Sequence, residues 1–214
     1  MARISVVGGT GYAGGAIVAE ARSRGHSVVS VARNEPDDRV AGVDYVSASA
    51  LDPEVLARVV DRSDVVIEAV SPRGDMAGQV EGLVDRLIEL ASRRGVRVGV
   101  IGGASSLLVS EGGPRLFDVS DPPPEVRPEI ETGLAVLARL NDAPESLDWF
   151  YVSPPESFGA WAPAPDTGAY RLSDDVLLRD AEGRSTISAA DLARAVLDEI
   201  EQPRYHRRRF HAAH

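Results

Sequence analysis

The chain has 214 residues, of which 43% are hydrophobic, and its formal net charge is −10. This length suffices for one sizeable core, and we expect residues 1–214 to form a single domain. A net negative surface repels phosphate backbones and anionic lipids, so we expect no nucleic acid and no membrane partner. The chain has no cysteine, which excludes disulfides and thiolate metal sites, and all 23 basic residues are arginine. With no signal-peptide pattern and no apolar run long enough to cross a bilayer, we expect a cytoplasmic protein.

Strands and helices alternate along most of the chain. Short β-branched runs predict buried strands at Arg3–Gly8, Ser27–Ala32, Asp44–Val46, Asp64–Val70, Val96–Ile101 and Leu147–Val152. Helical spacing of apolar residues predicts helices at Tyr12–Arg24, Pro53–Arg62, Met76–Arg93 and Pro128–Leu140. This alternation predicts an α/β fold, with a doubly wound parallel sheet that carries helices on both faces.

The C-terminal part follows a different pattern. Short strands are predicted at Ala169–Arg179 and Ser185–Ile187, and a last strand at Arg207–His211. Between them, Ser188–Glu201 is predicted to be a helix, with Ser188 as its N-cap.

Two long segments have no regular pattern, Ala104–Arg127 and Ser153–Gly168. Loops of this length in a compact domain are usually functional or disordered. Each follows a predicted parallel strand, so each begins at the carboxyl edge of the sheet. That edge is where open α/β sheets bind their ligands.

Three glycines separate the first strand from the first helix. Gly8, Gly11 and Gly14 have the spacing G-x-x-G-x-x-G. Glycine lets the backbone approach a pyrophosphate closely, and the N–H groups at the helix start then meet its charge. The alternative is a tight strand-to-helix turn without a ligand. The order of strand, glycines, helix and second strand favours a nucleotide site.

The end of the second predicted strand indicates which nucleotide is bound. NAD-binding proteins place an acid there for the ribose 2′-hydroxyl, whereas an arginine accommodates the 2′-phosphate of NADP. This chain has Arg33 followed by Asn34, and Glu35 comes after the strand should have ended. The alternative is that Arg33 is a solvated surface charge. The motif favours NADP(H) as the cofactor.

An ordered set of stretches resembles one known family. They are "GGTGYAGG", "VARN", "VRVGVIGGASSL", "LDWFYVSPP", "TGAYRL" and "ISAADLARAVLDEIEQP". Together they resemble the NmrA-like, atypical branch of the short-chain dehydrogenase/reductase superfamily, and most of all its small bacterial members. The resemblance implies an NAD(P)-binding Rossmann fold with NADP(H) as ligand and a small substrate-side region, residues 152–214. One departure is Ser49, which stands where many relatives have an acid that contacts adenine.

A cofactor bound in this way would touch four parts of the chain. The pyrophosphate would lie on Gly8, Thr10, Gly11, Tyr12, Ala13 and Gly14, and the 2′-phosphate on Arg33 and Asn34. The adenosine and its ribose would contact Ala69, Val70 and Ser71, and the nicotinamide half Gly102, Gly103, Ser153 and Pro154.

The usual acid/base pair of the superfamily is absent. Its Tyr-x-x-x-Lys motif uses the lysine to help the tyrosine pass a proton, and this chain has no lysine. The histidines do not replace that pair, since His26 precedes a strand and the other three lie near the C-terminus. The spacing of "HAAH" could hold a metal, but we expect a mobile terminal tail and no metal site.

Hydroxyl groups remain as candidates for contact with a substrate. Ser105 and Ser106 follow the "VIGG" strand, where relatives carry a serine that polarises the substrate, although the family position aligns nearer Ala104. The alternative is that both serines brace the long loop.

The two long segments also carry aromatic side chains. If both fold over the cofactor, Phe117, Phe158 and Trp161 would line an apolar pocket for a flat small-molecule substrate. The alternative is a dimer contact or packing within the loops, so monomer and homodimer both stay open.

A flat conjugated acceptor suits a reductase that has no strong acid. Flavins and quinones spread the charge of an added hydride over their rings, whereas simple ketones do not. The sequence therefore predicts an NADPH-dependent reductase of such compounds. Two alternatives remain: a non-catalytic NADP(H) redox sensor, and a tailoring enzyme of secondary metabolism.

Overall fold

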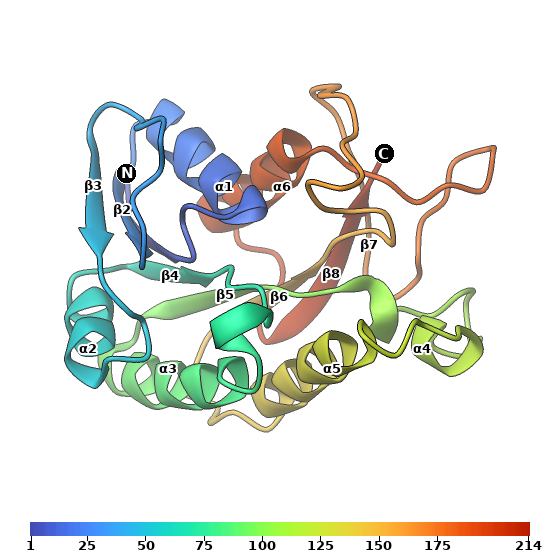
Figure 1. Ribbon diagram of the computed structural model, residues 1–214, viewed down its shortest axis with the longest axis horizontal. Helices are drawn as coiled ribbons and strands as arrows, with labels where there is room; N and C mark the ends of the chain where they lie inside the picture. The colour runs from blue at the N-terminus through green and yellow to red at the C-terminus, as the bar shows by residue number, and fades with distance from the viewer.

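One sheet of eight strands runs through the whole chain in the computed structural model, which describes residues 1–214 (Figure 1). In spatial order the strands are β3 (Val43–Ser47), β2 (Ser27–Ala32), β1 (Arg3–Val7), β4 (Val65–Glu68), β5 (Arg97–Ile101), β6 (Trp149–Ser153), β8 (Arg208–Ala213) and β7 (Arg171–Ser173). All neighbouring strands are parallel except β7, which pairs antiparallel with β8. The predicted doubly wound Rossmann fold is confirmed.

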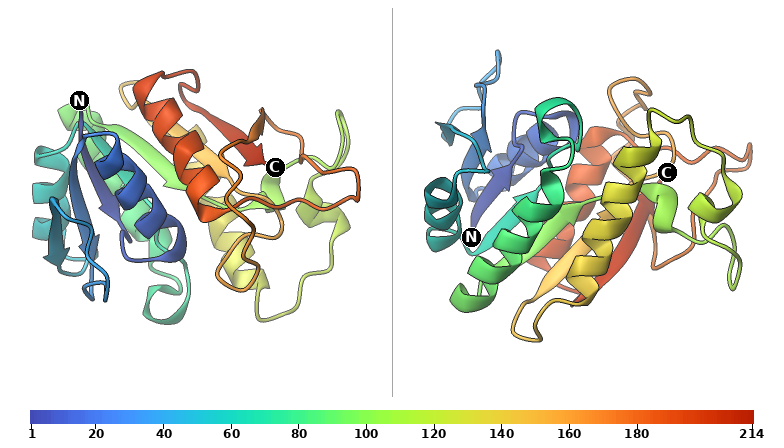
Figure 2. Two further views of the ribbon diagram at one scale, coloured as in Figure 1. Left: turned by 90° about the horizontal axis from the view of Figure 1, so that it is seen from above. Right: turned by 60° about the horizontal axis from the view of Figure 1, so that its bottom comes forward.

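Helices cover both faces of the sheet (Figures 1 and 2). On one face lie α1 (Tyr12–Ser23) and α6 (Ala189–Glu201), and on the other lie α2 (Pro53–Asp61), α3 (Val80–Arg94) and α5 (Arg127–Asn141). Two single 3-10 turns, Gly74–Met76 and Ala104–Ser106, and the short α4 (Leu116–Val119) lie in the connections at the carboxyl edge.

Local sequence signals start and stop several of these helices. Asp52 caps α2 by accepting hydrogen bonds from the amides of Glu54 and Val55. Ser188 caps α6 through the amide of Asp191, as the sequence predicts. At the end of α3, Gly95 adopts φ +66°, a left-handed conformation that glycine allows at little cost.

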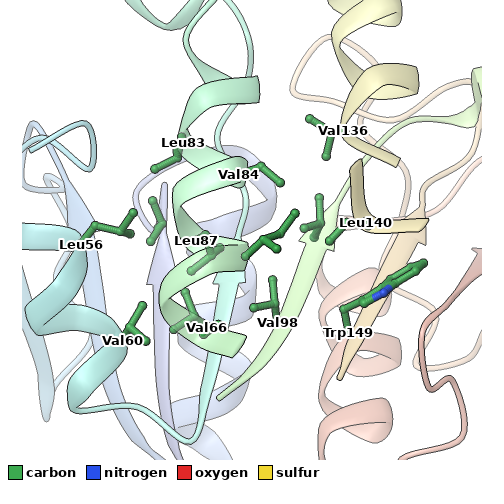
Figure 3. Packing of buried hydrophobic residues seen from close by; sticks show 14 of the residues in the cluster. Leu56, Val60, Val66, Leu83, Val84, Leu87, Val98, Val136, Leu140 and Trp149 are labelled. Atoms are coloured by element: carbon green, nitrogen blue, oxygen red, sulfur yellow. The ribbon is translucent and has the colours of Figure 1, made fainter. Parts of the chain in front are cut away.

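Each face of the sheet has its own apolar core. The cluster beneath α2, α3 and α5 has 23 buried residues, and Figure 3 shows side chains of these helices, such as Leu56, Leu87 and Leu140, directed at Val66 and Val98 of the sheet. The cluster beneath α1 and α6 has 18. These two layers hold the carboxyl ends of the strands rigidly in one row, so loops that leave them have fixed starting points.

Three predicted elements differ from the structure before the C-terminal strand. The helix predicted from Met76 begins only at Val80, because Gly78 adopts φ +70° and interrupts it. The strand predicted over Ala169–Arg179 is limited to Arg171–Ser173, where the Ser173 hydroxyl accepts a hydrogen bond from the Val176 amide and turns the chain. The segment Ser185–Ile187 is not a strand and makes one isolated bridge, between Thr186 and Ser157.

The C-terminal tail is a buried strand rather than the mobile segment that we expected. Phe210, Ala212 and Ala213 of β8 are fully buried, and β8 lies between β6 and β7. His211 is also fully buried, and its Nδ1 donates to the carbonyl of Ser153 at 2.8 Å. His214 contacts the carboxylate of Asp191 at 2.8 Å, which fixes the end of the chain.

No helix of the structure combines the length and the apolar character needed to cross a bilayer.

Candidate functional site

The structure explains the three glycines of the first loop in different ways. Gly8 has φ +85°, and a Cβ there would lie 2.7 Å from the carbonyl oxygen of Ala69. A Cβ on Gly14 would lie 2.2 Å from the oxygen of Gly8, so α1 can approach the loop only with glycine at this position. Gly11 is exposed, and its Cβ would meet only the oxygen of Gly8 at 3.3 Å. The fold therefore requires Gly8 and Gly14, whereas Gly11 keeps space open above the loop.

The same loop presents unused hydrogen-bond donors. The amides of Thr10, Tyr12 and Ala13 donate to no acceptor in the protein, because they precede or begin the first turn of α1. Free amides at a helix N-terminus favour a bound anion. The loop therefore fits a pyrophosphate, in chemistry and in the space that Gly11 leaves.

A cavity of about 250 Å³ begins at this loop and runs across the ends of β1, β2 and β4. Many of the predicted cofactor-binding residues line it: Gly8, Thr10, Gly11, Arg33, Asn34, Ala69, Val70 and Ser71. Ser49 is on its wall as well. The cavity thus brings together the end of the second strand, the glycine loop and the segment after β4, as an extended nucleotide requires.

Arg33 lies at the rim of this cavity and has a partner from another loop. Its Nη1 donates to the carboxylate of Asp75 at 2.7 Å, and both side chains are at least half exposed. An exposed pair of this kind is weak, so a phosphate can compete for the guanidinium.

A larger cavity of about 350 Å³ lies beside the first, over the ends of β4, β5 and β6. Val70 and Arg73 line both cavities, so they meet at a common rim. Of the residues predicted for the nicotinamide half, Gly102, Gly103 and Pro154 line the larger cavity. It is bounded on its far side by α5, through residues that include Ile130 and Val136.

The predicted acceptor residues divide into two groups. Ser105, Ser106, Phe158 and Trp161 line the larger cavity, and Trp161 is 65% exposed at its edge. Phe117 does not line it, because its ring instead lies 5.7 Å from the guanidinium of Arg127.

Ser106 and Ser105 have different neighbours. The hydroxyl of Ser106 accepts a hydrogen bond from Arg209 of β8 at 2.7 Å, which ties the loop after β5 to the C-terminal strand. Ser105 is only half buried, and its hydroxyl has no partner in the protein.

Four predicted cofactor residues lie outside the walls of both cavities. Ser153 is fully buried behind the sheet edge, next to His211. Tyr12, Ala13 and Gly14 belong to the first turn of α1, and the ring of Tyr12 packs edge-on against Phe158 at 5.2 Å. This aromatic pair connects the glycine loop with the second long segment.

Two buried polar groups at the floor of the larger cavity were not predicted as site residues from the sequence. Glu68, the last residue of β4, is 2% exposed, and burial raises the pKa of its carboxyl to about 8. Tyr151 of β6 accepts a hydrogen bond from the Gly103 amide at 3.2 Å and donates to the Gly133 carbonyl at 3.3 Å. Burial raises the pKa of Tyr151 to about 12. One signal could have revealed Glu68: it is the single acid inside an otherwise apolar strand, "VVIEAV".

No group of three or more histidine, aspartate or glutamate side chains is arranged to hold a metal ion.

Comparison with known proteins agrees with this geometry. The sequence profile of the family described as NAD(P)H-binding matches residues 8–203. The chain belongs to this family. The NAD(P)-binding part of the resemblance seen in the sequence is thereby confirmed.

Three relatives cover nearly the whole chain. The uncharacterized protein YwnB of Bacillus subtilis (strain 168) is 33% identical, over 97% of this chain and 96% of its own length. A crystal structure from Burkholderia pseudomallei, of a "putative exported protein", has a TM-score of 0.86 and 34% identity, with 100% of both chains covered. The crystal structure of SP1627 of Streptococcus pneumoniae TIGR4, called "a putative NADH-flavin reductase", has a TM-score of 0.83 and 29% identity. It covers 100% of this chain and 99% of that one.

Proposed function

We propose that the protein binds NADP(H) in the smaller cavity and reduces a flat conjugated compound, such as a flavin or a quinone, in the larger one. One observation carries this proposal: the two cavities meet at Val70 and Arg73, on the carboxyl edge of the sheet. A nucleotide that extends along the edge from Arg33 would have its far end beside Gly102 and Gly103. The bound dinucleotide would supply the hydride, and the chain's own residues would position the acceptor.

For the cofactor, the proposal assigns the pyrophosphate to the free amides of the first loop and the 2′-phosphate to Arg33. The segment Ala69–Ser71 would hold the adenosine ribose region, and Pro154 with Gly103 the nicotinamide end. The preference for NADP(H) over NAD(H) rests on Arg33 alone. The acid that pairs with Arg33 is Asp75, which lies in a different loop and not at the end of β2, where NAD-binding proteins place an acid.

For the acceptor, the shape and lining of the larger cavity favour a ring system. Its volume of about 350 Å³ is within the usual range for small-molecule sites, and apolar side chains form much of its wall. Residues 152–214 supply Pro155, Phe158 and Trp161, as a small substrate-side region would. The name of the similar SP1627 points to the same class of acceptor.

The resemblance to the NmrA-like branch of the short-chain dehydrogenases/reductases supports the same proposal. The resemblance implies NADP(H) as ligand; α5 contains neither tyrosine nor lysine, an absence that a non-catalytic redox sensor would also show.

The test uses purified protein, NADPH and a panel of acceptors. We expect NADPH oxidation, followed by the nicotinamide absorbance, with FMN or a naphthoquinone, and little oxidation with aliphatic ketones. NADH should support a lower rate at the same concentration. Turnover with ketones but not with FMN or the quinone would contradict the proposed acceptor class.

The second candidate is a redox sensor that binds NADP(H) but catalyses no reaction. The exposed Trp161 favours it, because tryptophan is enriched at the contact surfaces between proteins. A tailoring enzyme whose substrate supplies its own acid is the third. Tight NADPH binding without turnover across the panel would support the sensor.

A further inference from the structure

Glu68 is a buried carboxyl group that the proposed binding of cofactor and acceptor does not use. Its side chain points to the α3 and α5 face of the sheet and lines the larger cavity together with Val80, Val136 and Tyr151. One oxygen, Oε1, accepts a hydrogen bond from the Val70 amide at 2.8 Å. The other oxygen, Oε2, makes no hydrogen bond within the protein and is not among the fully buried atoms that lack a partner, so it keeps contact with the cavity that Glu68 lines.

A purely structural role does not account for a carboxyl group at this position. The Val70 amide needs one acceptor, and a neutral side chain such as asparagine or glutamine could provide it. A carboxyl group in an apolar setting carries a desolvation penalty that these side chains avoid. The free oxygen faces the cavity. We therefore connect the desolvation penalty of this carboxyl with a role in contacting the ligand of the cavity.

The surroundings keep this carboxyl neutral. The other titratable residues on the cavity wall are Arg73, Glu129, Glu156 and Tyr151. Arg73 is paired with Glu129 at 2.5 Å, and Arg209 of β8 with Asp175, so neither arginine compensates the charge of Glu68. Burial therefore dominates, and the raised pKa of about 8 means that the group is mostly protonated at neutral pH.

We propose that the Glu68 carboxyl donates a hydrogen bond, and then its proton, to the acceptor bound in the larger cavity. This inference rests on the proposed reductase function and assigns the proton donor of that reaction. The chain has no lysine, and the hydroxyl of Tyr151 on the cavity wall already donates to the Gly133 carbonyl. The structure instead places the buried carboxyl group of Glu68 on the wall of the larger cavity, beside the end of the strand that would face the nicotinamide.

The proposed step balances with one hydride and one proton. A quinone that receives a hydride from NADPH needs one proton to become the neutral hydroquinone, and a flavin needs one to reach its neutral dihydro form. The O–H bond of Glu68 breaks, and its proton goes to an oxygen or a ring nitrogen of the acceptor. The carboxylate that remains recovers a proton from water that enters the cavity when the product leaves.

The first experiment compares wild type with Glu68→Gln in single-turnover reduction of FMN and of a naphthoquinone by NADPH. Glutamine keeps an acceptor for the Val70 amide but has no proton to transfer. We expect the reduction rate to fall about 100-fold, while the affinity for NADPH does not change. The wild-type rate should decline as the pH rises past about 8, and the variant should lack this decline. Equal rates and the same pH dependence in both proteins would overturn the inference.

A second readout separates this inference from the proposed function. Infrared spectra of wild type at neutral pH should show a protonated-carboxyl band that is absent from Glu68→Gln, and a naphthoquinone should shift it. If the band shifts but no acceptor is reduced, the reductase proposal fails and the contact between Glu68 and the ligand stands. If the band is absent, or does not respond to the quinone, Glu68 is not the donor, whatever the turnover.

Discussion

The two cavities of this site are built in different ways. In the smaller one, the contacts proposed for the pyrophosphate come from backbone, because the glycine loop supplies the free amide of Thr10 and the space above Gly11. The larger one is formed by side chains that come from β4, α5, β6 and the two long loops. A backbone site depends on conformation at a few fixed positions, whereas a side-chain site depends on packing between distant segments. Substitutions at the two cavities should therefore impair binding and stability in different ways.

The largest effect on cofactor binding is expected from the backbone half. Gly11→Val should reduce NADPH binding by roughly 100-fold or more, equivalent to about 2.7 kcal/mol, because a side chain would fill the space above the loop. The fold should persist, since Gly11 has φ −76°, which any residue adopts. Calorimetric titration and thermal unfolding measure the two quantities.

Two other glycines serve as controls for this substitution. Gly15→Ala should change neither property, because its Cβ would be 3.8 Å from the nearest atom. Gly14→Ala should lower the melting temperature even without ligand, because its Cβ would be 2.2 Å from the Gly8 oxygen. Normal NADPH binding by Gly11→Val would show that the loop does not hold the pyrophosphate.

In the side-chain half, Glu68 should make stability depend on pH. Its ordinary pKa of 4.5 is raised to about 8 by burial, so the folded protein keeps a proton that the unfolded chain has released. The contribution of Glu68 to stability is therefore highest below pH 4.5 and is lost as the pH rises to about 8. Glu68→Gln should gain several kcal/mol relative to wild type over this window, measured by urea unfolding at a series of pH values. A constant difference between the two proteins would mean that folding does not raise the pKa of Glu68.

These two halves also differ in how far the sequence predicted them. Gly8, Gly11 and Arg33 belong to local patterns of strand, loop and helix. Their positions along the sequence therefore sufficed to predict that they lie at one cavity. The walls of the larger cavity depend on which distant segments pack together, and spacing carries no such information. Phe117 and Phe158 look equivalent in the sequence, yet only Phe158 reaches the cavity.

The C-terminal strand shows the same limit on a larger scale. Its residues were predicted as a short strand followed by a mobile tail, but the position of β8 between β6 and β7 is set by long-range pairing. That pairing buries His211 and brings Arg209 to Ser106. Glu68 was not predicted, for another reason: a single carboxyl inside an apolar strand belongs to no acid/base motif comparable to Tyr-x-x-x-Lys.

At the rim of the backbone half, Arg33→Ala tests the choice of cofactor. A charge-assisted hydrogen bond contributes about 1.5–3 kcal/mol, so the affinity for NADPH should fall roughly 10- to 100-fold. NADH has no 2′-phosphate, and its affinity should barely change. Equal losses for both cofactors, measured by titration, would show that Arg33 does not discriminate between them.

Trp161→Ala tests the acceptor wall with a smaller effect. Aromatic stacking contributes about 0.5–1.5 kcal/mol, so the KM for a naphthoquinone should rise roughly 2- to 13-fold. The value of kcat should change less, because stacking stabilises ground state and transition state alike. Phe117→Ala is the matched control, since Phe117 does not line the cavity, and it should leave KM unchanged. A larger effect from Phe117 than from Trp161 would contradict this account of the wall.

The smallest expected effect concerns Asp75, which holds Arg33 at 2.7 Å. A 2′-phosphate must compete with this carboxylate, and an exposed ion pair is worth about 0.2–1 kcal/mol. Asp75→Asn should therefore tighten NADPH binding by up to about 5-fold at low salt and less at high salt, without changing NADH binding. Glu35→Gln is the control, because Glu35 pairs with Arg39 instead. If Asp75→Asn weakens NADH binding instead, Asp75 holds a ribose hydroxyl, and the preference for NADP(H) inferred from Arg33 is reversed.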